Sequence, residues 1–306
     1  MQELLRSTTA YRAMGNAAHA TLIVFPDEKY LRTLLKECAK AFFQAKDGSR
    51  VAELIEKESF SDCLIYPAAG EKLTAELGAK IIDESLLRPV EGEKKLFVLD
   101  AFHNTSALVQ NKLLKVLEEP PAGVYFLLGA TAEYSVLPTV LSRMKKIVLA
   151  PFPEEAIRGA LTRKHGAAEG VAEAAAASGG VFSAAEELLA GGGEDFTLAE
   201  RFLLGDGIGV ARTVGERKDK KAVLAALKLT LRDALLIKTG QARYAARRGA
   251  RMEEIAERYP AAALLKGAEL AVLAEKQIGW NAPLAQCLET LAIGMEEERD
   301  KWQRLS

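Results

Sequence analysis

The sequence predicts an α/β domain built on a parallel sheet, followed by a region that is wholly helical. Short apolar runs of strand length alternate with helical segments over the first 150 residues. After Pro151-Phe152-Pro153 the chain changes to Ala- and Glu-rich helical sequence. Strands that alternate with helices form right-handed βαβ crossovers, which place the strands parallel in one doubly wound sheet.

Five apolar runs supply the strands of this sheet, at residues 21–25, 63–66, 96–99, 125–128 and 146–149. They lack the polar alternation of strands with one wet face, so we expect each to be covered on both faces. Apolar side chains at helical spacing predict helices between them, at residues 30–43 and 74–87.

Helical signals dominate the second half of the chain. Helices are predicted at residues 156–164, 171–178, 183–189, 222–238, 251–258, 261–278 and 282–302. Gly179-Gly180 marks a helix end, and Gly191-Gly192-Gly193 is the best linker candidate. We therefore expect an α/β domain at 1–150, a small helical domain at 151–193 and a helix bundle at 194–306.

Composition narrows the functional class. The 306 residues carry 41 basic and 42 acidic side chains, so no global field attracts nucleic acid or an anionic membrane, and contact with DNA must be local. The three cysteines are scattered and form no CxxC pair, which predicts neither a disulfide framework nor a zinc site and favours a reducing cytoplasm. No signal peptide and no apolar run of about 18 residues is present, so we expect no membrane segment.

The first strand is followed by a loop that lacks the residues of a phosphate site. A phosphate-binding loop needs glycines for close backbone approach, a lysine for charge and a hydroxyl for magnesium. Residues 26–33 read PDEKYLRT, where Leu31 takes the lysine position and Asp27 and Glu28 repel phosphate. Nucleotide binding in the ordinary mode is not expected. The alternative is that Lys29 or Arg32, with Thr33, still holds a phosphate.

The run Leu96-Phe97-Val98-Leu99-Asp100 has the form of a strand that ends in a magnesium-organising carboxylate. Working ATPases of this kind have a second acid next to it, and this chain has Ala101. An aspartate at a strand end is also a common turn or helix cap, and we favour this structural interpretation of Asp100. His103 follows without a visible partner cluster, so an ordinary hydrogen-bonded or surface histidine is expected.

Several segments together resemble the delta-prime family of bacterial DNA polymerase III clamp-loader subunits, in the AAA+ superfamily. The resemblance rests on a Walker B strand at 94–100, an asparagine-to-Glu-Glu-Pro-Pro helix at 111–121, a sensor-1 strand end at 129–131, a Ser-Arg segment at 137–143 and a lid motif at 178–185. A first loop poor in glycine is itself typical of delta-prime, whereas the catalytic gamma-type subunits keep the phosphate loop.

The chain also departs from the family pattern. Met144 stands where the segment normally ends Ser-Arg-Cys, and the zinc-binding cysteines common in the first domain are absent. Phe182 and Ser183 lie near the position of the sensor-2 arginine of active relatives. These departures put a zinc module and ATP hydrolysis in doubt.

The resemblance implies an AAA+ α/β domain with a degenerate phosphate loop, a helical lid and a carboxyl-terminal collar. It implies that Arg143, preceded by Ser142, acts in trans as an arginine finger on ATP held by a neighbouring subunit. A guanidinium placed in this way offsets charge in phosphoryl transfer. The alternative is a surface arginine that caps a helix end or pairs with Glu154 or Glu155. Glu118 and Glu119 are expected to pack at the subunit seam.

The function that follows is a non-hydrolysing stator in DNA polymerase III clamp loading during DNA replication, without a cofactor or metal of its own and without intrinsic ATPase activity. Implied partners are the gamma/tau and delta subunits, and the sliding clamp and primer-template DNA through the complex. Two alternatives stay open: a gamma/tau-like ATPase with an atypical nucleotide site, and an AAA+ adaptor in DNA repair.

Two basic runs, at residues 217–221 and 243–251, are the densest in the chain. Either run has the charge to contact phosphates. Both fall in the expected collar, where solvated helix faces or subunit contacts are the more common roles. We assign no DNA-binding residue from sequence.

Overall fold

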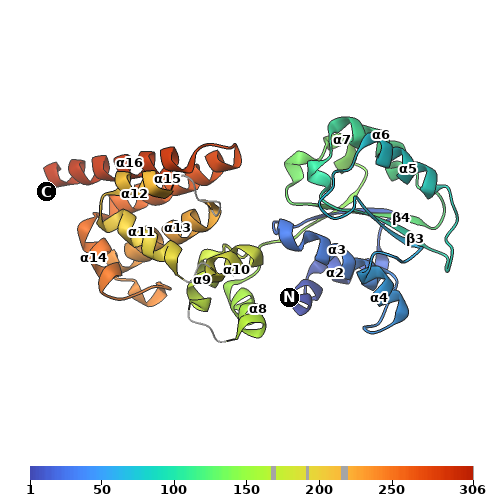
Figure 1. Cartoon of the computed structure of the whole chain (residues 1–306), viewed down its shortest axis with the longest axis horizontal. Coiled ribbons are helices and arrows are strands. Elements are labelled where there is room, and N and C mark those ends of the chain that lie inside the picture. Colours follow the sequence, from blue (N-terminus) through green and yellow to red (C-terminus); the bar gives the residue numbers. More distant parts are fainter. Residues whose placement is uncertain (167–169, 191–192, 215–219, 306) are drawn as a thin grey trace. The chain divides into compact units, whose positions relative to one another are not determined.

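A computed structural model describes residues 1–166, 170–190, 193–214 and 220–305 (Figure 1). The chain forms two compact units, Met1–Pro151 and Phe152–Ser306, each described by itself. Two features singled out in the sequence, the glycines at 191–192 and residues 217–219 of one basic run, lie outside the described residues.

The first unit contains the expected five-stranded parallel sheet, in the order β2-β3-β4-β1-β5. Its strands are β1 (Ala20–Val24), β2 (Cys63–Tyr66), β3 (Lys95–Leu99), β4 (Val124–Ala130) and β5 (Lys145–Val148). In register, Val24 lies opposite Ala130, and Leu99 opposite Leu128. The predicted α/β class and its parallel sheet are confirmed.

The expectation that every strand is covered on both faces is wrong for β5. All five residues of β1 and of β3 are buried, whereas in β5 three of four are exposed. β5 is an edge strand that pairs only with β1. Lys145 and Lys146 place charge on it, a common device that keeps an edge from pairing with another chain.

Helices cover both faces of the sheet (Figure 1). They are α1 (Gln2–Arg6), α2 (Thr9–Ala13), α3 (Glu28–Phe42), α4 (Arg50–Glu56), α5 (Ala75–Ser85), α6 (Ala107–Glu118) and α7 (Pro138–Leu141), with short 3-10 turns at Met14–Asn16, Phe102–Asn104 and Glu133–Ser135. α3 packs closely on β4, because a Cβ added to Gly129 would come 2.7 Å from Leu35 and 3.0 Å from Leu31. Glycine at 129 therefore sets the depth at which α3 lies on the sheet.

The second unit is helical throughout its described residues. Its helices are α8 (Glu154–His165), α9 (Val171–Ala177), α10 (Phe182–Ala190), α11 (Glu194–Leu204), α12 (Gly207–Val214), α13 (Lys220–Lys238), α14 (Ala250–Arg258), α15 (Ala261–Gly279) and α16 (Leu284–Leu305), with a 3-10 turn at Ala242–Tyr244. Leu231, Leu264 and Leu291 are fully buried in the core that α13, α15 and α16 share. A further division at residue 193 stays a prediction, since α13 contacts α9 and α10 as well as the bundle helices.

In the part of the chain that the structure describes, no helix combines the length and the apolar character needed to cross a membrane.

Candidate functional site

Three strands of the first unit end at the same edge of the sheet, beside the start of α3. Asp27 follows β1, Asp100 follows β3 and Thr131 follows β4. In parallel sheets, ligands bind at the carboxyl ends of the strands. This edge is therefore the candidate site, and its polar groups decide what it can hold.

Asp27 closes the amino-terminal end of α3. Its side chain is the helix N-cap, its Oδ1 accepts a hydrogen bond of 3.3 Å from the backbone N–H of Tyr30, and the residue is 1% exposed. The start of a helix attracts anions because its first N–H groups lack partners within the helix. Here a carboxylate of the chain itself takes the place that a phosphate group would need.

Asp100 is held by a cation from α3. Arg32 donates from Nη1 to Asp100 Oδ2 at 3.0 Å and to the backbone carbonyl of Pro67 at 3.0 Å. The other carboxylate oxygen, Oδ1, accepts from the N–H of Ala101 at 2.7 Å. Both side chains of the ion pair are largely buried, with 16% of Arg32 and 14% of Asp100 exposed. A guanidinium thus neutralises the carboxylate that would otherwise organise magnesium.

The sequence indicated Arg32 only as an offset candidate for phosphate, and nothing in it pointed to a pairing with Asp100. The two residues are 68 positions apart, and the packing of α3 against the sheet brings them together. The structural interpretation of Asp100 agrees with the contacts that the carboxylate makes.

Glu58 completes the charge cluster around Arg32. Arg32 Nε lies 2.8 Å from Glu58 Oε1, and Lys36 Nζ lies 3.0 Å from the same oxygen. The hydrogen bond from Arg32 is the main reason that the pKa of Glu58 falls to about 2, and Lys36 adds to it. Glu58 is therefore ionised in the folded chain even in moderately acidic solution.

This lowered pKa predicts an acid-sensitive contribution to stability. Because the pKa of Glu58 is lower in the folded chain than in the unfolded chain, its contribution is fully present above about pH 5 and is lost as the pH falls toward 2. We expect Glu58→Gln to flatten the fall in unfolding free energy over this range, measured by urea unfolding at several pH values. Glu53→Gln, on the exposed face of α4, is the control. Parallel pH profiles for wild type and Glu58→Gln would contradict the assignment.

His103 links two elements at the same edge. Its Nδ1 accepts from the backbone N–H of Thr131 at 3.3 Å, and its Nε2 lies 3.4 Å from Glu28 Oε1 at the start of α3. The side chain is 10% exposed. His103 is thus the hydrogen-bonded histidine that the sequence analysis expected, and it joins the end of β4 to α3.

Arg143 follows α7 in the same unit and is one-third exposed, at 33% of its side chain. Its Nε lies 2.8 Å from Glu118 Oε2, and its Nη1 donates to the carbonyl of Thr139 at 2.8 Å and to Ser142 Oγ at 3.3 Å. Ser142 Oγ donates in turn to the carbonyl of Thr139 at 3.1 Å. The guanidinium is held in place, and its ion pair is with Glu118 rather than with Glu154 or Glu155, the two partners considered from the sequence.

The basic run at 243–251 is partly taken up by contacts inside the second unit. Arg247 Nη2 lies 2.6 Å from Glu200 Oε1, and its guanidinium stacks 4.5 Å from the ring centre of Phe196. Arg248 donates to the carbonyls of Ala245 and Arg243 at 3.2 and 2.6 Å. These two arginines act within the fold, so the run offers fewer free charges than its sequence suggests.

Comparison with known proteins places this site in a family. A family model described as "DNA polymerase III, delta subunit" matches residues 2–153. That stretch contains all five strands and every residue of the candidate site. The chain belongs to this family through its amino-terminal half.

Individual members of related DNA polymerase III families match over shorter stretches. The tau subunit of Salmonella typhimurium is 36% identical over 104 residues, which is 34% of this chain and 16% of the relative. The tau/gamma subunit of Haemophilus influenzae is 36% identical over 103 residues, 34% of this chain and 15% of the relative. The matched stretches thus span about one-sixth of these relatives.

Among solved structures, a DNA polymerase III gamma subunit-related protein of Thermotoga maritima is similar, with a TM-score of 0.45 and 18% identity over 95% of this chain and 98% of that one. At that score the likeness is loose, so the family assignment rests on the sequence matches.

Proposed function

We propose that the chain is a delta-prime-like subunit of a DNA polymerase III clamp loader, one that does not hydrolyse ATP and serves as a rigid stator. The family match of the first unit and the similarity to tau and gamma subunits support membership of this complex. Its partners in this proposal are the gamma/tau and delta subunits, with the sliding clamp and primer-template DNA reached through the complex. The second unit then supplies the lid and collar.

The observation that carries the non-hydrolysing role is that the chain fills its own nucleotide position. Asp27 occupies the helix terminus that would receive phosphate, and Arg32 occupies the carboxylate that would receive magnesium. An incoming Mg-ATP would have to displace a buried N-cap and a buried ion pair, and no glycine in residues 26–33 allows close approach of the backbone. The fold of a nucleotide-binding domain is kept while its site is closed.

Arg143 is proposed to act outside the chain, as an arginine finger toward ATP on a neighbouring subunit. Its planar guanidinium suits phosphate oxygens, and its partial exposure leaves part of the donor set open. Ser142 Oγ accepts a hydrogen bond from Nη1 of Arg143, so the proposed role of Ser142 is to hold the guanidinium in position.

A second candidate is a gamma/tau-like ATPase with an atypical site, and the names of the similar proteins favour it. Direct binding separates the two. We expect the purified chain to show no saturable, magnesium-dependent binding of ATP by isothermal titration up to millimolar nucleotide, because Asp27 and Arg32 close the site. A gamma-type subunit measured in parallel is the positive control.

If the chain binds ATP and Asp100→Asn abolishes that binding, the proposal is contradicted, since the carboxylate would then still coordinate magnesium.

Capture of the tagged chain from extract addresses membership of the complex separately. Recovery of gamma/tau and delta subunits would support a place in the clamp loader, and recovery of repair proteins without them would favour the adaptor alternative.

A further inference from the structure

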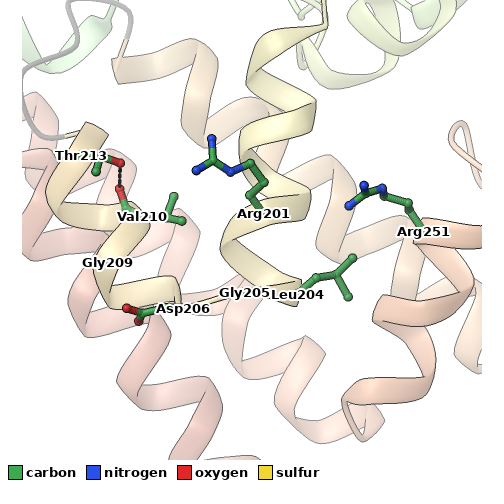
Figure 2. A pocket seen from close by; sticks show the side chains of 8 residues that line it. All are labelled: Arg201, Leu204, Gly205, Asp206, Gly209, Val210, Thr213 and Arg251. Carbon is green, nitrogen blue, oxygen red and sulfur yellow. Dashed lines mark hydrogen bonds between the residues drawn. The ribbon is translucent and has the colours of Figure 1, made fainter.

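The second unit contains a hollow of about 450 Å³ between α11, α12 and α14 (Figure 2). Two arginines contribute to its lining, Arg201 from α11 and Arg251 from α14. Figure 2 shows their side chains on either side of Leu204, with Val210 and Thr213 of α12 at the opposite end. The hollow belongs to the helix bundle and shares no residue with the site at the sheet edge.

Within the described residues, Arg201 has no counter-charge and Arg251 has a weak one. Arg201 is exposed, and there its guanidinium has no hydrogen-bond or ion-pair partner. Arg251 is 65% exposed and has only a loose contact, 3.8 Å from Nε to Glu200 Oε2. Glu200 is already committed, because its other oxygen binds Arg247 at 2.6 Å. Two positive charges are therefore available at one concave surface.

One carboxylate, that of Asp206, also lines the hollow. It lies against Gly209 in the first turn of α12, where the helix terminus stabilises an anion. A second hollow of about 370 Å³ shares Gly205 and Asp206 and is lined by the acids Glu296, Glu297 and Asp300. The first hollow thus has two arginines beside one aspartate, whereas the lining of the second has four acids and no basic residue, so an anionic ligand favours the first.

We propose that the hollow at Arg201 and Arg251 binds an acidic peptide segment of a partner protein, with carboxylates on the two guanidiniums and an apolar side chain against Leu204 and Val210. Arginine pairs with carboxylates through two parallel N–H donors, which gives both strength and orientation. The apolar wall favours a peptide over a nucleic-acid backbone, because a DNA backbone needs a row of positive charges along an open face. The proposal does not depend on the arginine-finger role.

The test uses the whole chain and a fluorescein-labelled hexapeptide of alternating glutamate and leucine, followed by fluorescence anisotropy. We expect saturable binding that Arg201→Ala and Arg251→Ala each weaken about tenfold, the usual effect of removing one charged hydrogen-bond donor. Arg212→Ala is the matched control. Arg212, on α12, is exposed like the other two arginines, but it pairs with Glu289 and does not line the hollow. Circular dichroism checks that each variant is folded.

Two further probes sharpen the result. A peptide of alternating glutamine and leucine is expected not to bind, and a twelve-nucleotide single-stranded DNA is expected to bind more weakly than the acidic peptide. Equal binding by wild type and both arginine variants, or no binding of the acidic peptide, would overturn the proposal. So would tighter binding of the DNA, or self-association of the chain that Arg201→Ala abolishes, since the occupant would then be nucleic acid or a second copy.

Discussion

Arg143→Ala is expected to lower ATP hydrolysis by the reconstituted clamp-loader ring, although the variant chain folds normally. An arginine supplied in trans contributes ~10³–10⁵ to the rate of phosphoryl transfer at the site it serves. The ring should therefore lose nearly all turnover at one nucleotide site and keep turnover at the others. Steady-state hydrolysis by rings that contain wild-type or variant chain measures this loss.

The stability of the isolated chain should hardly change, because the ion pair of Arg143 with Glu118 is partly exposed at both ends, 33% and 52%. Exposed pairs of this kind contribute about 0–1 kcal/mol. Thermal unfolding of Arg143→Ala alongside wild type checks that the lost turnover is not a folding defect.

Glu118→Gln is the matched control, since it removes the same ion pair from the other side. If Arg143 acts only within its own chain, both variants should have the same effect on the ring. If Arg143 reaches a neighbour's phosphate, Glu118→Gln should lose far less turnover than Arg143→Ala, because the guanidinium itself is still present. Arg143→Lys should remain impaired, because an ammonium lacks the planar fork of donors. Unchanged turnover in Arg143→Ala rings would remove the proposed finger.

The sheet was predictable because its inner strands are apolar on both faces. Leu22 and Val98 are fully or almost fully buried, and the runs around them contain no polar alternation that would have suggested a wet face. The run at 146–149 was predicted on the same ground, but it belongs to an edge strand, and Lys145 and Lys146 were the signal that this strand differs. Burial by neighbouring strands is a tertiary property that a single run does not encode.

The contacts at the candidate site were not predictable in the same way. Asp27 was singled out as a charge that repels phosphate and Asp100 as the residue that ends a strand, but the partner of Asp100 came from a helix 68 residues away. The short helices α1, α2 and α4 were also missed. Helices of five to seven residues are too short to show a periodic stripe or to be stable alone, and they depend on tertiary contacts.

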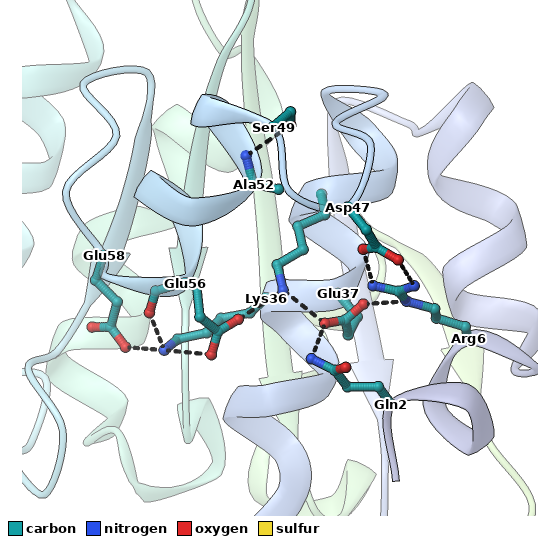
Figure 3. Close-up of polar contacts among 10 residues, drawn as sticks. Gln2, Arg6, Lys36, Glu37, Asp47, Ser49, Ala52, Glu56 and Glu58 are labelled. Atoms are coloured by element: carbon teal, nitrogen blue, oxygen red, sulfur yellow. Dashed lines mark hydrogen bonds and ion pairs between the residues drawn. The ribbon is translucent and has the colours of Figure 1, made fainter.

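One of those tertiary contacts is a buried charge network that holds α1 against α3 (Figure 3). Glu37 of α3 is fully buried, and its Oε2 lies 2.5 Å from Nε of Arg6 on α1. Its Oε1 accepts from Lys40 Nζ at 2.8 Å, and Arg6 continues to Asp47 at 2.6 Å. Lys40 also reaches Glu56 of α4 at 2.7 Å. The Glu37 carboxylate thus connects α3 to α1 directly, through Arg6, and to α4 indirectly, through Lys40 and Glu56.

Glu37→Ala is expected to lower the free energy of unfolding by about 3 to 5 kcal/mol, because it leaves buried positive charge without its central partner. Lys40 is only 8% exposed and would be left with Glu56 as its one ion-pair partner among the described residues. Arg6 would be left with Asp47, at the surface. Urea unfolding measures the loss. Because α1 depends on this contact, limited trypsin digestion should also cleave near Arg6 and Arg12 sooner than in wild type.

Two variants separate a buried-charge effect from the simple loss of a carboxylate. Asp47→Ala removes the outer end of the same network, but Asp47 is 72% exposed, so we expect a loss of at most about 1 kcal/mol. Glu53→Ala removes an exposed carboxylate of α4 and should stay within about 0.5 kcal/mol of wild type. The ordering follows from desolvation: water can replace a lost partner at Asp47, whereas it cannot reach Glu37. Equal losses for Glu37→Ala and Asp47→Ala would show that burial does not set the strength of this network.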